Sequence, residues 1–117
     1  MSQHHKINYL EMPAKDMAQT KRFFGALFDW KFIDYGPEYC AVENAGIDCG
    51  FYLSQHSAEQ EKGSVLIVFY SDDLAHSLAH VRACGGAISK DIFAFPGGRR
   101  FHFLDPNGNE FAIWQAD

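Results

Sequence analysis

Apolar and polar positions along the chain follow the same order twice. The segment at residues 7–12, in which apolar residues predominate, precedes Asp16 and a helical pattern that ends near Phe28. In the second half, the apolar run Val65–Tyr70 precedes Asp73 and another helical pattern. The two aspartates stand 57 residues apart. An internal repeat of this kind predicts two structural modules of the same design.

Both predicted helices are amphipathic and begin beside an aspartate. A carboxylate there accepts hydrogen bonds from the free N–H groups of the first turn, so Asp16 and Asp73 are expected to be N-caps. The second helix is expected to end at Gly85-Gly86, because glycine commonly follows the last helical residue. The inward faces are predicted to carry Met17, Thr20, Phe24, Leu27 and Phe28 in the first helix, and Leu74, Leu78 and Val81 in the second.

Three short strand-like runs follow each predicted helix, separated by turn-forming residues. They are Trp30–Tyr35, Tyr39–Glu43 and Ile47–Leu53, and then Ala87–Phe95, Arg100–Leu104 and Asn109–Gln115. Each half therefore reads βαβββ, which predicts an α+β fold. We expect one domain over residues 1–117, with modules at about 6–53 and 64–115 joined by a linker at 54–63. Neither half could bury its sheet face alone at about 50 residues, so curved mixed sheets around a shared pocket are expected.

Composition and charge narrow the choice of partners. Hydrophobic residues make up 47% of the chain and charged residues 21%, as in a globular domain. The net charge of −5 leaves no excess of lysine and arginine to neutralise phosphates, so nucleic acid is not an expected partner. The longest apolar run is far shorter than the roughly 20 residues that a membrane helix needs, so no membrane association is expected.

The N-terminal segment and the cysteines indicate the compartment. Residues 1–6 lack the apolar core of a signal peptide. The three cysteines are odd in number and form no metal-binding spacing, so Cys40, Cys49 and Cys84 are expected to act as small buried hydrophobes. We therefore expect a cytoplasmic protein.

Three short motifs accompany the repeat: Phe23-Phe24, Gly85-Gly86 and the turn Asp105-Pro106-Asn107-Gly108-Asn109 before the last strand. With the paired βαβββ pattern, they resemble the vicinal oxygen chelate superfamily, and within it the glyoxalase/bleomycin-resistance-like proteins. The resemblance implies helices on the outer faces and a ligand pocket lined by the sheets. The superfamily includes metal-dependent lyases, isomerases and dioxygenases as well as metal-free antibiotic-binding proteins, so the fold alone does not choose the function.

The resemblance also implies four metal-ligand positions, two in each module. They fall on Tyr9, Gly50, Leu66 and Ala112. Three of these side chains have no donor atom, and a phenol binds a divalent ion poorly unless it is deprotonated. We therefore expect no metal cofactor of the family type.

Strand alternation places further candidates beside those four positions. Glu11 is the candidate catalytic residue, either orienting a ligand donor or acting as a general base. The alternative is a carboxylate satisfied by the backbone or by Arg100. The expected ligand-binding set is Tyr9, Glu11, Asp48, Gly50, Tyr52, Leu66, Arg100, His102, Ala112 and Trp114.

Other charged side chains have different predicted roles. Arg99 and Arg100 could clamp an anion through a forked guanidinium group, and the alternative is one solvated and one packed cation. Asp48 and Glu110 adjoin turns and are also compatible with simple solvation. His76 and His80 are four residues apart but are expected to face solvent, away from the apolar helix face.

Three functions remain open from the sequence. The first is metal-independent binding of a small organic molecule in an aromatic-lined pocket, by a protein that is expected to form a homodimer. The second is a lyase, isomerase or dioxygenase-type enzyme, with unconventional metal ligands such as Glu11 and His102 or with metal-free acid–base catalysis by Glu11. The third is a dimeric interaction module whose pocket has no ligand.

Overall fold

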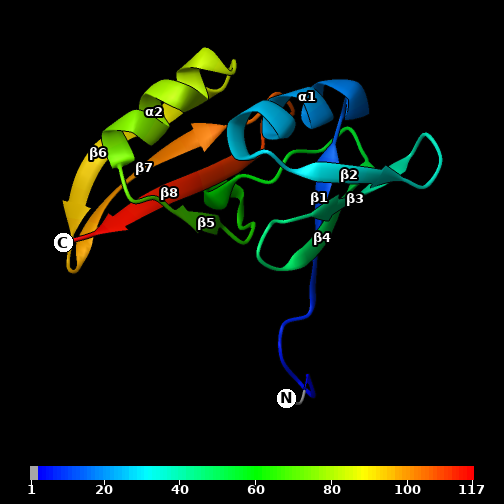
Figure 1. Cartoon of the computed structure of the whole chain (residues 1–117), viewed down its shortest axis with the longest axis horizontal. Coiled ribbons are helices and arrows are strands. Elements are labelled where there is room, and N and C mark those ends of the chain that lie inside the picture. The colour runs from blue at the N-terminus through cyan, green and yellow to red at the C-terminus, as the bar shows by residue number, and fades with distance from the viewer. Residues whose placement is uncertain (1–2) are drawn as a thin grey trace. The chain divides into compact units, whose positions relative to one another are not determined.

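The computed structural model describes residues 3–117, so the first two residues of the N-terminal segment lie outside the described part. The chain divides into two compact units, Met1–His56 and Ser57–Asp117. Each unit contains a strand, a helix and three further strands, in that order (Figure 1). This confirms the predicted α+β fold of tandem βαβββ modules.

Unit 1 is a four-stranded mixed sheet with one helix. Its elements are β1 (Tyr9–Ala14), α1 (Met17–Phe28), β2 (Lys31–Asp34), β3 (Tyr39–Glu43) and β4 (Asp48–Leu53). The strand order is β1-β4-β3-β2, with β1 parallel to β4 and the other pairs antiparallel. The proline at position 13 lies in β1, which it can occupy because β1 is an edge strand that needs no hydrogen bonds on its open side.

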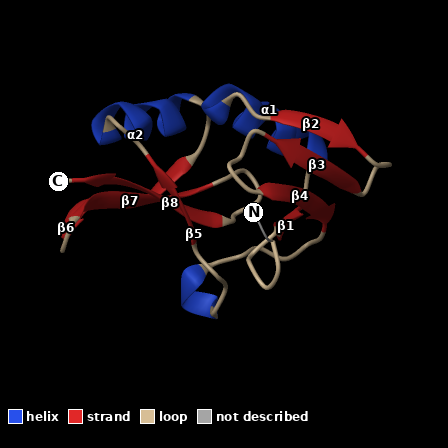
Figure 2. Ribbon diagram, turned by 60° about the horizontal axis from the view of Figure 1, so that its bottom comes forward, coloured by secondary structure: helices blue, strands red, loops and turns tan. Residues whose placement is uncertain are grey.

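Unit 2 repeats this arrangement, with a shorter first strand and three longer strands after the helix. Its elements are the short 3₁₀ helix Gln60–Lys62, β5 (Ile67–Tyr70), α2 (Leu74–Ala83), β6 (Ala87–Phe95), β7 (Gly98–Leu104) and β8 (Glu110–Ala116). The strand order is β5-β8-β7-β6, and only the β5–β8 pair is parallel. Figure 2 shows that α1 and α2 each lie on one face of the sheet of their own unit.

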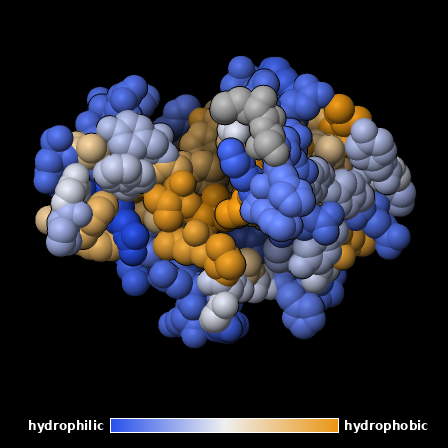
Figure 3. Space-filling model, turned by 90° about the horizontal axis from the view of Figure 1, so that it is seen from below, coloured by the Kyte–Doolittle hydropathy of each residue, from blue (hydrophilic) through white to orange (hydrophobic). Residues whose placement is uncertain are grey.

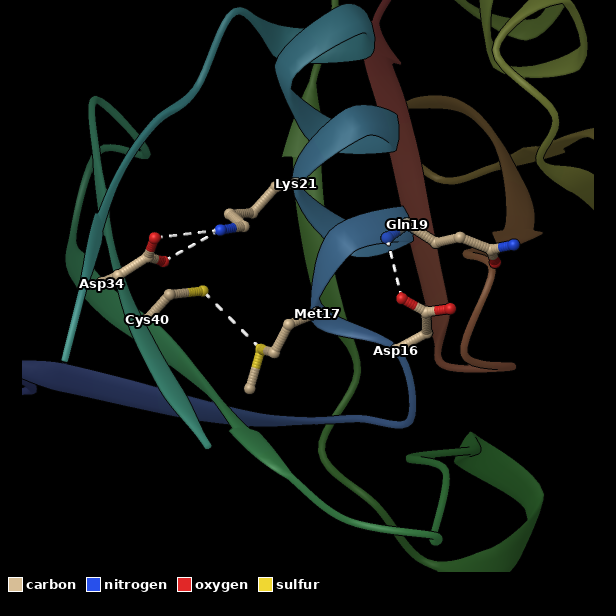
Figure 4. Close-up of polar contacts among 6 residues, drawn as sticks. All are labelled: Asp16, Met17, Gln19, Lys21, Asp34 and Cys40. Carbon is tan, nitrogen blue, oxygen red and sulfur yellow. Dashed lines mark hydrogen bonds and ion pairs between the residues drawn. The ribbon is translucent and has the colours of Figure 1, made fainter. Parts of the chain in front are cut away.

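Both helices begin at the aspartates that the sequence singles out. The Asp16 carboxylate accepts a hydrogen bond from the Gln19 N–H at 3.0 Å, and Asp73 accepts one from the His76 N–H at 3.1 Å. Around α1, Lys21 Nζ lies 2.9 and 3.1 Å from the two carboxylate oxygens of Asp34 on β2 (Figure 4). The helix starts are thus set by local side-chain chemistry.

Aromatic side chains form the core between α1 and its sheet. The Phe24 ring on α1 lies 5.5 Å from the Phe51 ring on β4 and 4.7 Å from the Trp30 ring. Cys40 and Cys49 are buried on the same face of the sheet, and the Cys40 thiol lies 3.9 Å from the Met17 sulfur. The prediction that these two cysteines act as small hydrophobes is confirmed.

The core of unit 2 is equally rich in phenylalanine. Phe101, Phe103 and Phe111 are fully or almost fully buried, as are Leu74 and Val81 on α2. The Phe103 and Phe111 rings stack with their centroids 5.5 Å apart. These rings fill the space between helix and sheet, as the alternation of the strands predicts.

Some predicted boundaries were wrong by a few residues. The strand expected at Val65–Tyr70 begins only at Ile67, so Leu66 precedes the sheet. Cys84 is half-buried rather than buried. His76 is exposed as predicted, and His80 is half-buried with its ring centroid 6.0 Å from that of His76. No helix among residues 3–117 is long and apolar enough to cross a membrane.

Candidate functional site

The turn before β8 is a buried hydrogen-bond centre. The Asp105 carboxylate accepts hydrogen bonds from the backbone N–H groups of Asn107 and Asn109, both at 2.9 Å, and from their side-chain amides, both at 3.2 Å. Burial raises the pKa of Asp105, and these four hydrogen bonds act in the opposite direction. The motif that carries the family resemblance therefore has a structural role at the start of β8.

The segment predicted to be a linker forms hydrogen bonds with this turn. The Ser57 hydroxyl donates to the Asn107 carbonyl at 2.6 Å, and the Ala58 N–H donates to the Asn109 side-chain oxygen at 2.8 Å. The Gln60 N–H donates to the Glu110 carboxylate at 3.0 Å. Residues 57–60 are therefore an ordered part of unit 2.

In unit 1, the sheet face opposite α1 carries most of the predicted polar candidates. Strand pairing places Glu11 beside Gly50 and Tyr9 beside Asp48. Because side chains on a strand alternate between faces, these four residues and Tyr52 share one face. Tyr9 and Tyr52 are exposed to 42% and 40%, so they are accessible from solvent.

A residue that the sequence reasoning missed lies at the centre of this face. Tyr39 on β3 has its hydroxyl oxygen 2.5 Å from that of Tyr9. Burial, followed by hydrogen bonds with Tyr9 and Glu11, raises the pKa of Tyr39 well above its ordinary value. Its phenol therefore stays protonated and donates to the Glu11 carboxylate. The Tyr9 and Tyr39 hydroxyl groups share one hydrogen bond, in which either can be the donor.

Tyr39 also explains why position 50 is glycine. A Cβ atom at Gly50 would overlap the Tyr39 hydroxyl oxygen and would lie 2.7 Å from its ring carbon Cζ. The same Cβ would lie 2.8 Å from the Cys40 carbonyl oxygen. The space above Gly50 is thus filled by Tyr39 and is not open for a ligand. The signal available in the sequence was the strand alternation of β3, which puts Tyr39 on the same face as Glu11.

In unit 2, the equivalent face carries a buried histidine–glutamate pair. His102 on β7 is fully buried, and its Nδ1 lies 2.7 Å from Glu110 Oε2 on β8. Burial opposes ionisation of Glu110, but the hydrogen bonds from His102 and the Gln60 N–H outweigh it and lower the pKa. Glu110 is therefore ionised and paired rather than simply solvated.

The second nitrogen of His102 has a different environment. His102 Nε2 is buried and has no hydrogen-bond partner among residues 3–117. A buried polar atom without a partner costs about 1–3 kcal/mol of folding free energy. The Phe93 ring covers this histidine, with the ring centroids 5.8 Å apart.

Beside the pair lies a pocket built from an arginine and aromatic rings. Val68, Phe95, Arg100 and Trp114 line a hollow of about 200 Å³. The Arg100 guanidinium carbon lies 5.3 Å from the Phe93 ring centroid and 5.6 Å from that of Phe95. Within the described part of the chain, no acidic side chain pairs with Arg100, and its buried Nε has no acceptor.

Apolar side chains are also exposed near this pocket. Val68, which lines it, is 41% exposed, and Tyr70 on the same strand is 54% exposed. Figure 3 shows hydrophobic side chains gathered near the middle of the face in view, with smaller groups elsewhere, next to hydrophilic ones. A ligand that combines an apolar body with a charged group would match such a surface.

A larger hollow, of about 470 Å³, lies in unit 1. It is lined by Gln3, Ile7, Asn8 and the turn residues 44–48, Asp48 included. None of these residues is aromatic and only Asp48 is charged, so the hollow has neither an aromatic wall nor a cation for a ligand. We therefore place the candidate site at the smaller pocket in unit 2.

The residues present do not fit a metal site of the family type. Gly50, Leu66 and Ala112 have no side-chain donor, and the Tyr9 hydroxyl is engaged with Tyr39. Over the described range of 3–117, no three histidine, cysteine, aspartate or glutamate side chains are grouped to hold an ion. The four family-type positions therefore do not supply a ligand set for a divalent ion, and the lack of a metal cofactor stays a prediction.

Comparison with known families decides the relationship. The family model described as the Glyoxalase/Bleomycin resistance protein/Dioxygenase superfamily matches residues 6–113. The chain belongs to this superfamily. Among curated proteins, none matches the sequence.

Solved structures of the superfamily share the fold. A glyoxalase-related enzyme from Fulvimarina pelagi is 22% identical, with a TM-score of 0.77, and the match covers 95% of this chain and 88% of that one. A family enzyme from Burkholderia phytofirmans PsJN is 16% identical, with a TM-score of 0.77 and coverages of 94% and 98%. The fosfomycin resistance protein FosX from Listeria monocytogenes is 17% identical, with a TM-score of 0.77 and coverages of 95% and 93%.

The predicted site residues separate into two groups. In unit 1, Tyr9, Glu11, Asp48, Gly50 and Tyr52 share one sheet face. In unit 2, register pairing places His102 beside Ala112 and Arg100 beside Trp114, while Leu66 precedes the strand. The ligand-binding role of both groups, the homodimer and the cytoplasmic location stay predictions.

Proposed function

We propose that this superfamily member binds a small organic acid with a flat apolar body, without a metal, in the pocket formed by Arg100, Trp114, Phe95 and Val68. The observation that carries the proposal is Arg100. Its guanidinium group lies over two phenylalanine rings and has no acidic partner in the described chain. A cation held in this way provides a forked donor for a carboxylate.

The rest of the pocket favours an aromatic or similarly flat body. The Trp114 ring lies 5.0 Å from the Tyr70 ring and 6.1 Å from the Phe95 ring, which gives a rigid aromatic wall. Aromatic walls with a few polar groups are typical of small-molecule sites. Metal independence is supported by the lack of donor side chains at Gly50, Leu66 and Ala112.

The test compares matched acids and amides. Benzoate, phenylacetate and 3-phenylpropionate are titrated by calorimetry and by the fluorescence of Trp114, each beside its neutral amide. We expect at least one acid to bind about tenfold more tightly than its amide, because a charge-assisted pair with arginine contributes on the order of 1.4 kcal/mol. Binding should be the same in chelator-treated protein and with added Zn²⁺ or Mn²⁺.

Variants connect the effect to one side chain. Arg100→Gln should reduce the affinity for the acid to that for the amide, whereas the exposed neighbour Arg99→Gln should leave it unchanged. Trp114→Phe should remove the fluorescence response while the calorimetric signal remains. Equal binding of acids and amides by the unaltered protein, or equal losses in the two arginine variants, would show that Arg100 does not hold an anion.

A further inference from the structure

The strongest unexplained feature of the molecule is the inner nitrogen of His102. The imidazole is fully buried on β7, and Nδ1 is held at 2.7 Å by Glu110. Nε2 is also buried, yet nothing within residues 3–117 bonds to it. Buried polar atoms in folded proteins almost always have a partner, so an atom without one points to a missing ligand or water.

The Glu110 carboxylate decides what Nε2 can do. Glu110 is ionised because hydrogen bonds from His102 and the Gln60 N–H outweigh its burial. An ionised carboxylate only accepts, so Nδ1 must carry the proton that joins the pair. In the neutral ring, Nε2 then has a free lone pair and is an acceptor for an O–H group.

His102 lies next to the proposed anion site. Arg100 and His102 are two residues apart on β7, so their side chains leave the same face of the sheet. On one side, β8 presents only the methyl group of Ala112 to His102, and on the other side, β6 has Lys90 at the paired position. The two polar groups are therefore neighbours, with no larger side chain on β8 at that register position.

Phe93 connects the two groups. Its ring centroid lies 5.8 Å from that of His102 and 5.3 Å from the Arg100 guanidinium carbon. It stands on the edge strand β6, just after an irregularity in the pairing with β7 between Lys90 and Phe93. The side chain is 36% exposed, so it can turn away without leaving a buried core position.

We propose that the ligand is a hydroxy acid, whose carboxylate is held by Arg100 and whose hydroxyl donates to His102 Nε2 once Phe93 has turned aside. This rests on the proposed function, because it assumes the carboxylate at Arg100. Glu110 is a positioning residue in this arrangement, since it fixes the proton on Nδ1 and so keeps Nε2 an acceptor. The site would thus distinguish acids by one hydroxyl group.

The experiment uses pairs of acids that differ only in that hydroxyl. Mandelate is compared with phenylacetate, and 3-hydroxy-3-phenylpropionate with 3-phenylpropionate, by calorimetric titration of the full chain. We expect the hydroxy acid of at least one pair to bind about fivefold more tightly, as one added hydrogen bond to a buried partner allows. His102→Gln and Glu110→Gln should both reduce this preference, and Arg100→Gln should weaken all four acids.

Two further measurements test the proposal even if the His102 and Glu110 variants fail to fold. Phe93→Ala, at an exposed edge position, should retain or increase the preference for the hydroxy acid because it uncovers Nε2. Nitrogen NMR of the unaltered protein labelled at histidine should show a shift of His102 Nε2 with the hydroxy acid and a much smaller one with its partner.

The outcomes separate the two proposals. If the acids bind more tightly than their amides but both members of each pair bind equally, the proposed function stands and the hydroxy-acid inference is wrong. If none of the four acids binds and His102 shows no shift, both are wrong. A hydroxyl preference that survives in His102→Gln and Glu110→Gln would also overturn the inference.

Discussion

The two units have the same fold and place opposite chemistry on equivalent sheet faces. In unit 1 that face presents the acidic side chains Glu11 and Asp48, with Tyr39 donating to Glu11. In unit 2 it presents Arg100 and a histidine that is anchored by a carboxylate. The repeated fold therefore determines where side chains are displayed, and a few substitutions determine whether the face attracts donors or anions.

The turns before the last strands differ as strongly. In unit 2, the carboxylate of Asp105 collects four hydrogen bonds inside the turn and is 5% exposed. In unit 1, the corresponding turn at residues 44–47 lines an open hollow and leads to the exposed Asp48. One turn stabilises its unit through a buried network, and the other does not.

The largest effect is expected at this buried turn. Asp105→Ala leaves two backbone and two side-chain N–H groups without their acceptor, and should lower the free energy of unfolding by about 3 kcal/mol. Asp48→Ala, at the exposed residue that follows the unit 1 turn, should change it by less than about 0.5 kcal/mol. Urea denaturation followed by circular dichroism measures both. Similar values for the two variants would remove the distinction between the turns.

Glycine substitutions test the filling of the unit 1 face. Gly50→Ala forces a methyl group into the Tyr39 hydroxyl and toward the Cys40 carbonyl, and should destabilise the protein by about 2 kcal/mol. Gly25→Ala, inside α1, meets only the Trp30 carbonyl oxygen at 3.8 Å and should stabilise it by about 0.5–1 kcal/mol. Thermal and urea unfolding of the two variants should therefore shift in opposite directions. A stable Gly50→Ala protein would mean that Tyr39 leaves this position readily.

Low pH should remove the stability that unit 2 gains from the His102–Glu110 pair. The pKa of Glu110 is lowered in the folded state from its ordinary value of 4.5, so its contribution to stability is present above that pH and is lost as pH falls through the folded value. Glu110→Gln should cost about 1.5 kcal/mol at neutral pH, and the difference from the unaltered protein should shrink below pH 4.5. Urea unfolding of both proteins at several pH values above and below 4.5 measures this difference. A difference that is constant with pH would mean that the carboxylate gains nothing from His102.

Much of the fold could be predicted from the sequence because its signals are local. Asp16 and Asp73 cap their helices, and Phe101 and Phe103 alternate into the core, as their spacing alone indicates. The family follows from the repeated pattern and the turn at residues 105–109. Such features depend on neighbours a few positions away along the chain.

The site was less predictable because it depends on which strands pair. Tyr39 reaches Tyr9 across thirty positions of sequence, and nothing local to either residue indicates that contact. The position of Glu110 beside a turn is compatible with solvation. Only the pairing of β7 with β8 places its carboxylate against His102. Gly50 belongs to the expected ligand-binding set, but the Tyr39 side chain from the adjacent strand fills the space above it.

The strand order has a consequence for synthesis on the ribosome. In each sheet the last strand made, β4 or β8, is an inner one that joins the first strand to the third. Every strand of unit 1 has been made once Leu53 is added, so that sheet can form while unit 2 is still being translated. In unit 2, β5 has no partner strand until residues 110–116 are made. Nascent chains stalled before these residues would expose the edges of β5 and β7 that β8 pairs with in the finished sheet.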